Sequence, residues 1–289
     1  LADRLRGLDT AGMARFFGLH PKIDDETRQH LASFDFVISF LHDPDGVVRD
    51  NLMANGVRRL LYRSPVGPAG HIVDHLVQPL ESLAIYEAGA APALSLNSAV
   101  VERGRAGLDA LGVRSRPVAI HCGSGSARKN WPFDRFAAVA RAIAPSHALA
   151  FVLGEGDHAI ANAIRDLARE TSAAVLEGLD LVELAGTLAN CAAYLGNDSG
   201  ITHIAAALGL PTIALFGPTD PAVWGPRGAQ VRILRSSSDQ MDSLEVEPVL
   251  SALREALSMA STETPPARDR SSKPDGPMTP AGDVPPPVA

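Results

Sequence analysis

Apolar runs and amphipathic stretches alternate along the middle and C-terminal parts of the chain. Five short apolar runs have the length and composition of buried strands: residues 117–121, 148–153, 173–176, 192–195 and 212–216. Between and after them, apolar residues at helical spacing predict helices at 181–190, 202–208 and 248–259, one with an apolar face from Phe133 to Ile143, and one with its apolar face at Ile160, Ile164 and Leu167. This alternation predicts an α/β fold in which helices cover both faces of a parallel sheet.

The first part of the chain is less regular. Residues 36–40 read as a strand that ends in a turn at 42–46, residues 59–62 as a second strand, and residues 72–84 as a helix. A linker is expected near 113–116. The chain therefore divides into an N-terminal domain at 1–115, a C-terminal domain at 116–260 and a tail at 261–289.

Composition narrows the function classes. The tail holds eight of the 22 prolines and is expected to be disordered, because it has too few apolar residues to form a core. The net charge of −7 argues against a nucleic-acid binder, and no apolar run is long enough for a transmembrane segment. Two cysteines outside any CxxC motif give no metal site or disulfide and suit a cytoplasmic protein. The first residue is Leu1, so we expect the N-terminal domain to be truncated.

Three polar loops follow predicted strands, where parallel α/β sheets bind ligands. The first holds Ser124, Gly125, Ser126 and Lys129, with backbone amides, hydroxyls and a cation suited to phosphate. It is neither a dinucleotide fingerprint, since GxGxxG fails at Arg128, nor a P-loop. Taken alone, a simple turn that caps the next helix is as good an interpretation.

The second loop places Glu155 between two glycines, where a carboxylate suits the hydroxyls of a ribose, although a solvated turn is the better interpretation of this loop alone. Asp157 is expected to cap the following helix.

The third loop holds Asp198, Ser199 and Gly200 and is followed by His203. Asp198 or Ser199 suits a helix cap, and Ser199 with the next amides suits phosphate oxygens. Because a carboxylate repels a diphosphate, Asp198 is expected to bind sugar hydroxyls, His203 or backbone amides. A lone histidine such as His203 is usually a packed core residue. Three such loops on one sheet edge nevertheless predict a site for a nucleoside-diphosphate sugar.

The motifs that carry these loops resemble glycosyltransferase family 9, the heptosyltransferases. HCGSGSARKNWP at 121–132 is similar to the family's HPGSGSxxKxWP, and GNDSGITH at 196–203 with FGPTDP at 216–221 is similar to a second family motif. The resemblance spans about Val118 to Gly228. It implies a GT-B architecture, in which two Rossmann-like domains face a cleft.

The resemblance also implies residue roles. Ser124, Gly125, Ser126 and Lys129 would hold the donor phosphates, Glu155 the ribose, the backbone of Leu179 the base, and Asp198, Ser199, Gly200 and His203 the diphosphate and sugar. Lys129 would stabilise the leaving group.

The same resemblance implies an inverting enzyme at the cytoplasmic face of the inner membrane. It would move a heptose-like sugar from ADP-heptose or a similar donor to a lipid-linked, lipopolysaccharide-type saccharide acceptor, with no metal and no other cofactor.

One family motif is missing. The family's RxGxxGD loop, which carries the proposed general base, has no counterpart before Leu31, so the general base stays unknown. His42, Asp43 and Asp45 lie in a loop that suits the cleft but are not assigned. Two alternatives stay open: an inactive protein that binds a sugar nucleotide, and a sugar-nucleotide epimerase.

Overall fold

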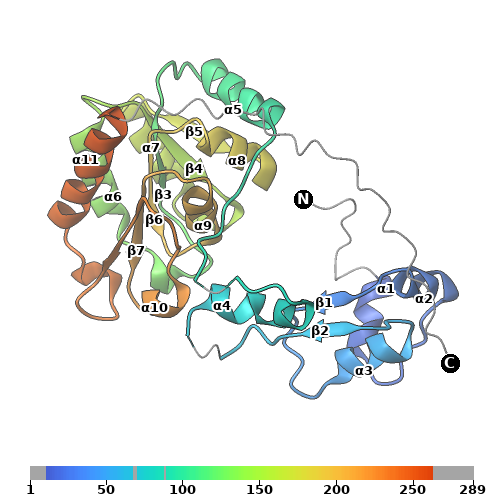
Figure 1. The fold of residues 1–289 in the computed structure, drawn as a ribbon. Coiled ribbons are helices and arrows are strands. Elements are labelled where there is room, and N and C mark those ends of the chain that lie inside the picture. Colours follow the sequence, from blue (N-terminus) through green and yellow to red (C-terminus); the bar gives the residue numbers. More distant parts are fainter. Residues whose placement is uncertain (1–10, 68–69, 88, 263–289) are drawn as a thin grey trace, which may run out of the picture.

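A computed structural model describes residues 11–67, 70–87 and 89–262, which form two units (Figure 1). The predicted tail at 261–289 lies outside the described residues from position 263 onward. No helix in the described ranges has both the length and the apolar character needed to cross a bilayer.

The C-terminal unit is built on a six-stranded parallel sheet. Its strands are β3 (Val118–His121), β4 (Leu149–Leu153), β5 (Ala174–Glu177), β6 (Ala193–Asn197), β7 (Thr212–Phe216) and β8 (Val231–Arg235). They lie in the order β5-β4-β3-β6-β7-β8, and every neighbouring pair is parallel. Counted from β3, this is the 3-2-1-4-5-6 order of dinucleotide-binding folds, whose order reverses between β3 and β6. The predicted parallel sheet is confirmed, although edge strand β8 was not predicted.

Helices cover both faces of this sheet, as predicted. One face packs on α6 (Phe133–Ile143), α7 (Ala161–Glu170) and α11 (Val246–Thr262). The other packs on α5 (Ser98–Ala110), α8 (Leu181–Leu188) and α9 (Gly200–Ala207). The four strands β3, β4, β6 and β7 are buried along their whole length. Both cysteines are buried and free, so neither forms a disulfide.

Helix α5 joins the C-terminal unit by a close helix crossing. A Cβ added to Gly104 would lie 2.2 Å from the carbonyl carbon of Gly186 on α8, so only two glycines allow this approach. The segment before α5 is also attached, because Leu94 donates its amide to the carbonyl of Ala207 at 2.8 Å. The domain boundary expected after residue 115 stays a prediction. Helix α5 lies before this position in the sequence but packs on the C-terminal unit.

The N-terminal unit contains two parallel strands in its described part, β1 (Val37–Ser39) and β2 (Leu60–Tyr62), at the places predicted. Around them lie α1 (Ala11–Ala14), η1 (Arg15–Phe17), α2 (Asp25–Ala32) and α3 (Val47–Ala54), whose apolar side chains form a small core around Phe16. The predicted helix at 72–84 divides into α4 (Ile72–Val77) and the 3-10 helix η2 (Gln78–Leu83).

Two residues at the start of α4, its N-cap His71 and Asp74, connect the N-terminal unit to the C-terminal unit. His71, which caps α4, contacts the carbonyl oxygen of Gly225 through Nε2 at 2.8 Å. Arg227 forms two hydrogen bonds to the carboxylate of Asp74, at 2.7 and 2.6 Å. The Arg227 guanidinium, helped by the Gly89 amide, holds the pKa of Asp74 well below its usual value of 3.8. The segment after α10 (Pro221–Trp224) is thereby attached to the N-terminal unit (Figure 1).

Candidate functional site

The three predicted loops meet at one cavity of about 340 Å³ at the carboxyl ends of β3, β4 and β6. Its wall includes residues from each loop: Ser124 and Gly125 after β3, Gly154 and Gly156 after β4, and Ser199 and Gly200 after β6. Glu155 stands between Gly154 and Gly156 in the sequence and is the first residue of the short 3-10 helix η4 (Glu155–Asp157). The cavity thus sits at the point where the strand order reverses, where sheets of this order bind their ligands.

The loop after β3 is held at both ends by one buried amide side chain. Asn197, the last residue of β6, donates from Nδ2 to the carbonyl of Cys122 at 2.9 Å and accepts from the amide of Trp131 at 3.0 Å. Inside the loop, the Ser124 hydroxyl lies 2.6 Å from Asn130 Oδ1 and 2.8 Å from the Ser126 carbonyl. These bonds fix the backbone of the loop against β6.

Lys129 lies beside the loop after β6. Its Nζ is 2.8 Å from Oδ2 of Asp198, which also accepts a hydrogen bond from the Thr219 hydroxyl at 2.8 Å. The Asp198 side chain is 8% exposed and that of Lys129 is 32% exposed. The two polar loops therefore share one face of the sheet edge. The structure places Lys129 and Thr219 at this carboxylate, two partners that were not expected, and the binding of sugar hydroxyls by Asp198 stays a prediction.

Ser199 caps α9, one of the two caps expected. Its hydroxyl accepts from the amide of Thr202 at 3.4 Å. The first amides of a helix have no partner within the helix, and two of the residues that supply them here, Gly200 and Ile201, line the cavity. An anion is favoured at such a helix start.

His203 is half-buried in the first turn of α9, outside the wall of the cavity. Burial lowers the pKa of His203, and the nearby His71 and Lys129 add to this, while Asp198 and the Trp224 backbone act in the opposite direction. His203 therefore belongs to a group of polar side chains to which both units contribute. Leu179 is 39% exposed in the turn between β5 and α8, whereas Leu181 lines the cavity.

Asp157 does not cap α7, contrary to the prediction, because Ile160 occupies the N-cap position. Its side chain turns inward instead. Oδ2 accepts from the amide of Gly154 at 2.7 Å and contacts Nε2 of His121 at 3.2 Å. Burial alone would raise the pKa of Asp157, but the hydrogen bonds from His121 and Gly154 outweigh it and hold this pKa below its usual value.

The residues that sequence reasoning missed are Asn197, His121, Asp157 and Thr219. Asn197, His121 and Thr219 stand inside the quoted motifs, so a signal existed for them, but their roles depend on contacts between separate loops. In the N-terminal unit, Asp43 accepts hydrogen bonds from the amides of Val48 and Arg49, at 3.1 and 2.8 Å, which fits a role in starting α3.

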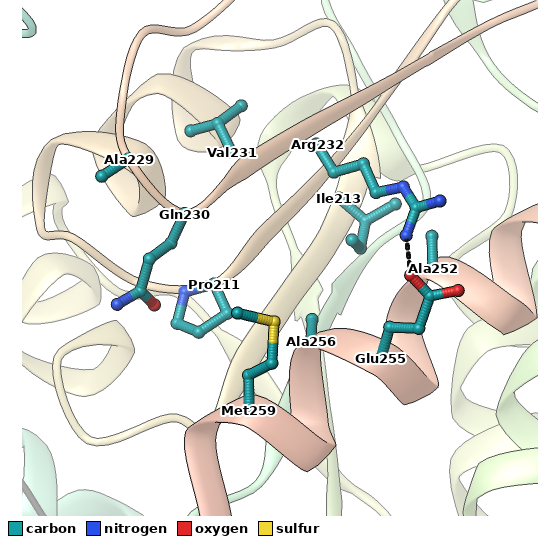
Figure 2. A pocket seen from close by; sticks show the side chains of 10 residues that line it. All are labelled: Pro211, Ile213, Ala229, Gln230, Val231, Arg232, Ala252, Glu255, Ala256 and Met259. Carbon is teal, nitrogen blue, oxygen red and sulfur yellow. Dashed lines mark hydrogen bonds and ion pairs between the residues drawn. The ribbon is translucent and has the colours of Figure 1, made fainter. Parts of the chain in front are cut away.

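A second cavity, of about 400 Å³, lies at the opposite end of the sheet (Figure 2). Its wall combines the amino ends of β7 and β8 with the last turns of α11, and Arg232 forms an ion pair with Glu255 at its rim. Its other residues are mostly apolar, among them Pro211, Ile213 and Ala256. Because parallel sheets bind ligands at their carboxyl ends, we place the functional site at the first cavity.

Known proteins are similar to parts of this chain. Lipooligosaccharide heptosyltransferase 2 of Haemophilus influenzae is 35% identical over 112 residues, which are 37% of this chain and 32% of the relative. Lipopolysaccharide heptosyltransferase 3 of Escherichia coli is 30% identical over 161 residues, which are 54% of this chain and 46% of the relative. The aligned part thus spans about a third to a half of these relatives.

Solved structures extend the likeness to both units. A glycosyl transferase family 9 protein from Veillonella parvula superposes with a TM-score of 0.68 at 19% identity, over 81% of this chain and 77% of the other. ADP-heptose lps heptosyltransferase II of Escherichia coli gives 0.65 at 19% identity, over 82% and 81%. An Escherichia coli heptosyltransferase solved with ADP gives 0.61 at 18% identity, over 80% and 76%. These likenesses confirm the predicted GT-B architecture.

The family assignment rests on a longer match. The model of glycosyltransferase family 9 (heptosyltransferase) matches residues 67–252, which is more than half of the chain and includes all three loops around the cavity. With its motifs, its fold and this match in agreement, the chain belongs to glycosyltransferase family 9.

Proposed function

We propose that this chain binds a nucleoside-diphosphate sugar at the carboxyl edge of its C-terminal sheet and transfers the sugar to a saccharide acceptor with inversion. One observation carries the proposal: loops after three different strands enclose a single cavity of about 340 Å³. The ammonium of Lys129, a residue outside the wall of this cavity, is 2.8 Å from the carboxylate of Asp198, which precedes the α9 cap. A diphosphate, a ribose and a sugar need such a combination of amides, cation and hydroxyl-binding groups.

The reaction is a single displacement at the anomeric carbon. The acceptor hydroxyl attacks this carbon and loses its proton to a general base, while the bond to the diphosphate oxygen breaks. Negative charge then accumulates on the leaving diphosphate. Lys129 and the first amides of α9 stabilise that charge, and such fixed donors commonly make the largest contribution to catalysis. Asp198 and Thr219 hold the lysine ammonium in place for this task.

The finer assignment follows the family. We propose ADP-heptose or a similar sugar nucleotide as donor, and a lipid-linked saccharide of the lipopolysaccharide type, at the inner face of the inner membrane, as acceptor. The relatives named as heptosyltransferases support the donor sugar. The structural neighbour solved with ADP supports an adenine base.

Two measurements test the proposal. Calorimetry with ADP, UDP and GDP should show binding of one nucleotide, ADP, at least tenfold tighter than the other two. Incubation with ADP-heptose and a heptose-deficient lipopolysaccharide should then add the mass of one heptose to the acceptor. Binding of none of the three nucleotides would contradict the proposal, and tight binding without any transfer would favour the inactive donor-binding alternative.

A further inference from the structure

A buried histidine–aspartate pair joins two of the loops around the donor cavity. His121 is the last residue of β3, and Asp157 ends the turn after β4. Their side chains are 6% and 2% exposed, and Nε2 of His121 is 3.2 Å from Oδ2 of Asp157. Both residues line the cavity.

The carboxylate of Asp157 contacts both loops at once. Its Oδ2 accepts the amide of Gly154, at the start of the loop after β4, at 2.7 Å. Its Oδ1 packs against Gly123 in the loop after β3, where an added Cβ would lie 1.5 Å from it. A side chain at position 123 would therefore collide with the Asp157 carboxylate, so the aspartate, and not a turn, explains the glycine.

Stability alone is a weak reason for such a pair. A buried carboxylate loses its hydration on folding, and the contacts that it gains inside the protein often only offset that loss. In the part of the chain that the structure describes, Nδ1 of His121 is buried and has no hydrogen-bond partner. An unpaired buried polar atom costs free energy, because it loses its hydrogen bonds to water and gains none in the protein. A pair with this cost, in the wall of a ligand cavity, points to a role in binding.

We propose that His121 and Asp157 are positioning residues, which hold the loop after β3 and the loop after β4 at the spacing that lets both contact one donor nucleotide. This inference rests on the proposed function, since it concerns the same cavity. The pair itself acts through the loops: His121 orients the carboxylate, and the carboxylate orients the Gly154 amide and the Gly123 backbone.

Binding of ADP to purified variants tests the proposal, by calorimetry at a temperature at which circular dichroism shows every variant to be folded. Asp157→Ala should weaken ADP binding at least tenfold, and so should His121→Ala. Asp157→Asn should stay within about threefold of the wild type, because its amide oxygen still accepts from Gly154 and its shape is kept. The double alanine variant should bind no more than threefold more weakly than the weaker single variant, since both residues act through one pair.

His158→Ala is the matched control, because this exposed histidine is adjacent in sequence to the pair, and it should bind ADP like the wild type. The proposal is overturned if Asp157→Ala binds ADP within twofold of the wild type, or if losses in the double variant multiply. It is also overturned if Asp157→Asn binds as weakly as Asp157→Ala, because the charge would then contact the ligand directly. A wild-type protein that binds neither ADP, UDP nor GDP would contradict the proposed function itself.

Discussion

Removal of the Lys129 ammonium should slow sugar transfer at least tenfold. A unit charge about 4 Å from a phosphate oxygen contributes roughly 4 kcal/mol at an effective dielectric constant of about 20. The Lys129 side chain is 32% exposed, so water screens part of this energy. The amides at the start of α9 also stabilise the diphosphate, which lowers the contribution of the lysine. A loss of about 1.4 kcal/mol, which is tenfold in rate, is therefore a lower bound for Lys129→Ala.

The ion pair with Asp198 provides a sharper version of this test. Without the lysine, the carboxylate of Asp198 would lie next to the diphosphate with no cation beside it, and the repulsion alone would slow transfer. Steady-state kinetics, with release of the nucleoside diphosphate as readout, should therefore compare Asp198→Asn with the double variant that also carries Lys129→Ala. If the lysine acts on the donor, the double variant should stay at least tenfold slower than Asp198→Asn.

Two results would refute this reasoning. Equal rates for Asp198→Asn and the double variant would show that Lys129 only neutralises Asp198. Unchanged kinetics of Lys129→Ala on a donor confirmed by calorimetry would remove the lysine from the mechanism. Lys22→Ala, which removes an exposed lysine of the N-terminal unit, is the control and should transfer at the wild-type rate.

Two further predictions concern the contacts that assemble the protein. Gly104→Ala should destabilise the protein by about 1–3 kcal/mol, because the added methyl group overpacks against Gly186. Gly107→Ala should be neutral or slightly stabilising, because the space around this residue of the same helix is open. Equal melting temperatures for the two variants would contradict this prediction. Arg227→Met should lower the melting temperature at pH 7. Since the pKa of Asp74 is depressed in the folded state, its contribution is complete above pH 4 and is lost as the pH falls below its usual value of 3.8. The difference between Arg227→Met and wild type should therefore shrink in melts below pH 4, and a constant difference would argue against the pair.

The central strands of the C-terminal sheet could be predicted from the sequence because they are buried on both faces. Residues 212–216 became β7 with the bounds predicted, since a short and mostly apolar run between turn residues has few other structures open to it. Edge strand β8 was missed because it is only partly buried and carries Arg232 and Arg235. Helix α5 was missed because Gly104 and Gly107 weaken its helical pattern, and at Gly104 the reason for the glycine lies on another helix.

The loops that form the site could be predicted from the sequence, but the contacts between their side chains could not. Glycines, hydroxyls and a lysine after successive strands were enough to place one edge of the sheet, because parallel strands end on the same side. The partner of Asp198 was not predictable, since Lys129 is far from it in the sequence and nearby only after folding. Asp157 was read as a helix cap because that is the usual role of an aspartate before a helix, and its pairing with His121 depends on the sheet register.

The attachment of α5 determines where the molecule can bend. From Leu94 onward the chain is fastened to the C-terminal unit, first by the bond to Ala207 and then by the glycine contact with α8. A rotation of one unit against the other would therefore have its hinge before residue 94, and α5 would move with the C-terminal unit. Spin labels on α5 and α11 would keep their separation when donor enters, while labels on α3 and α11 would report any closure.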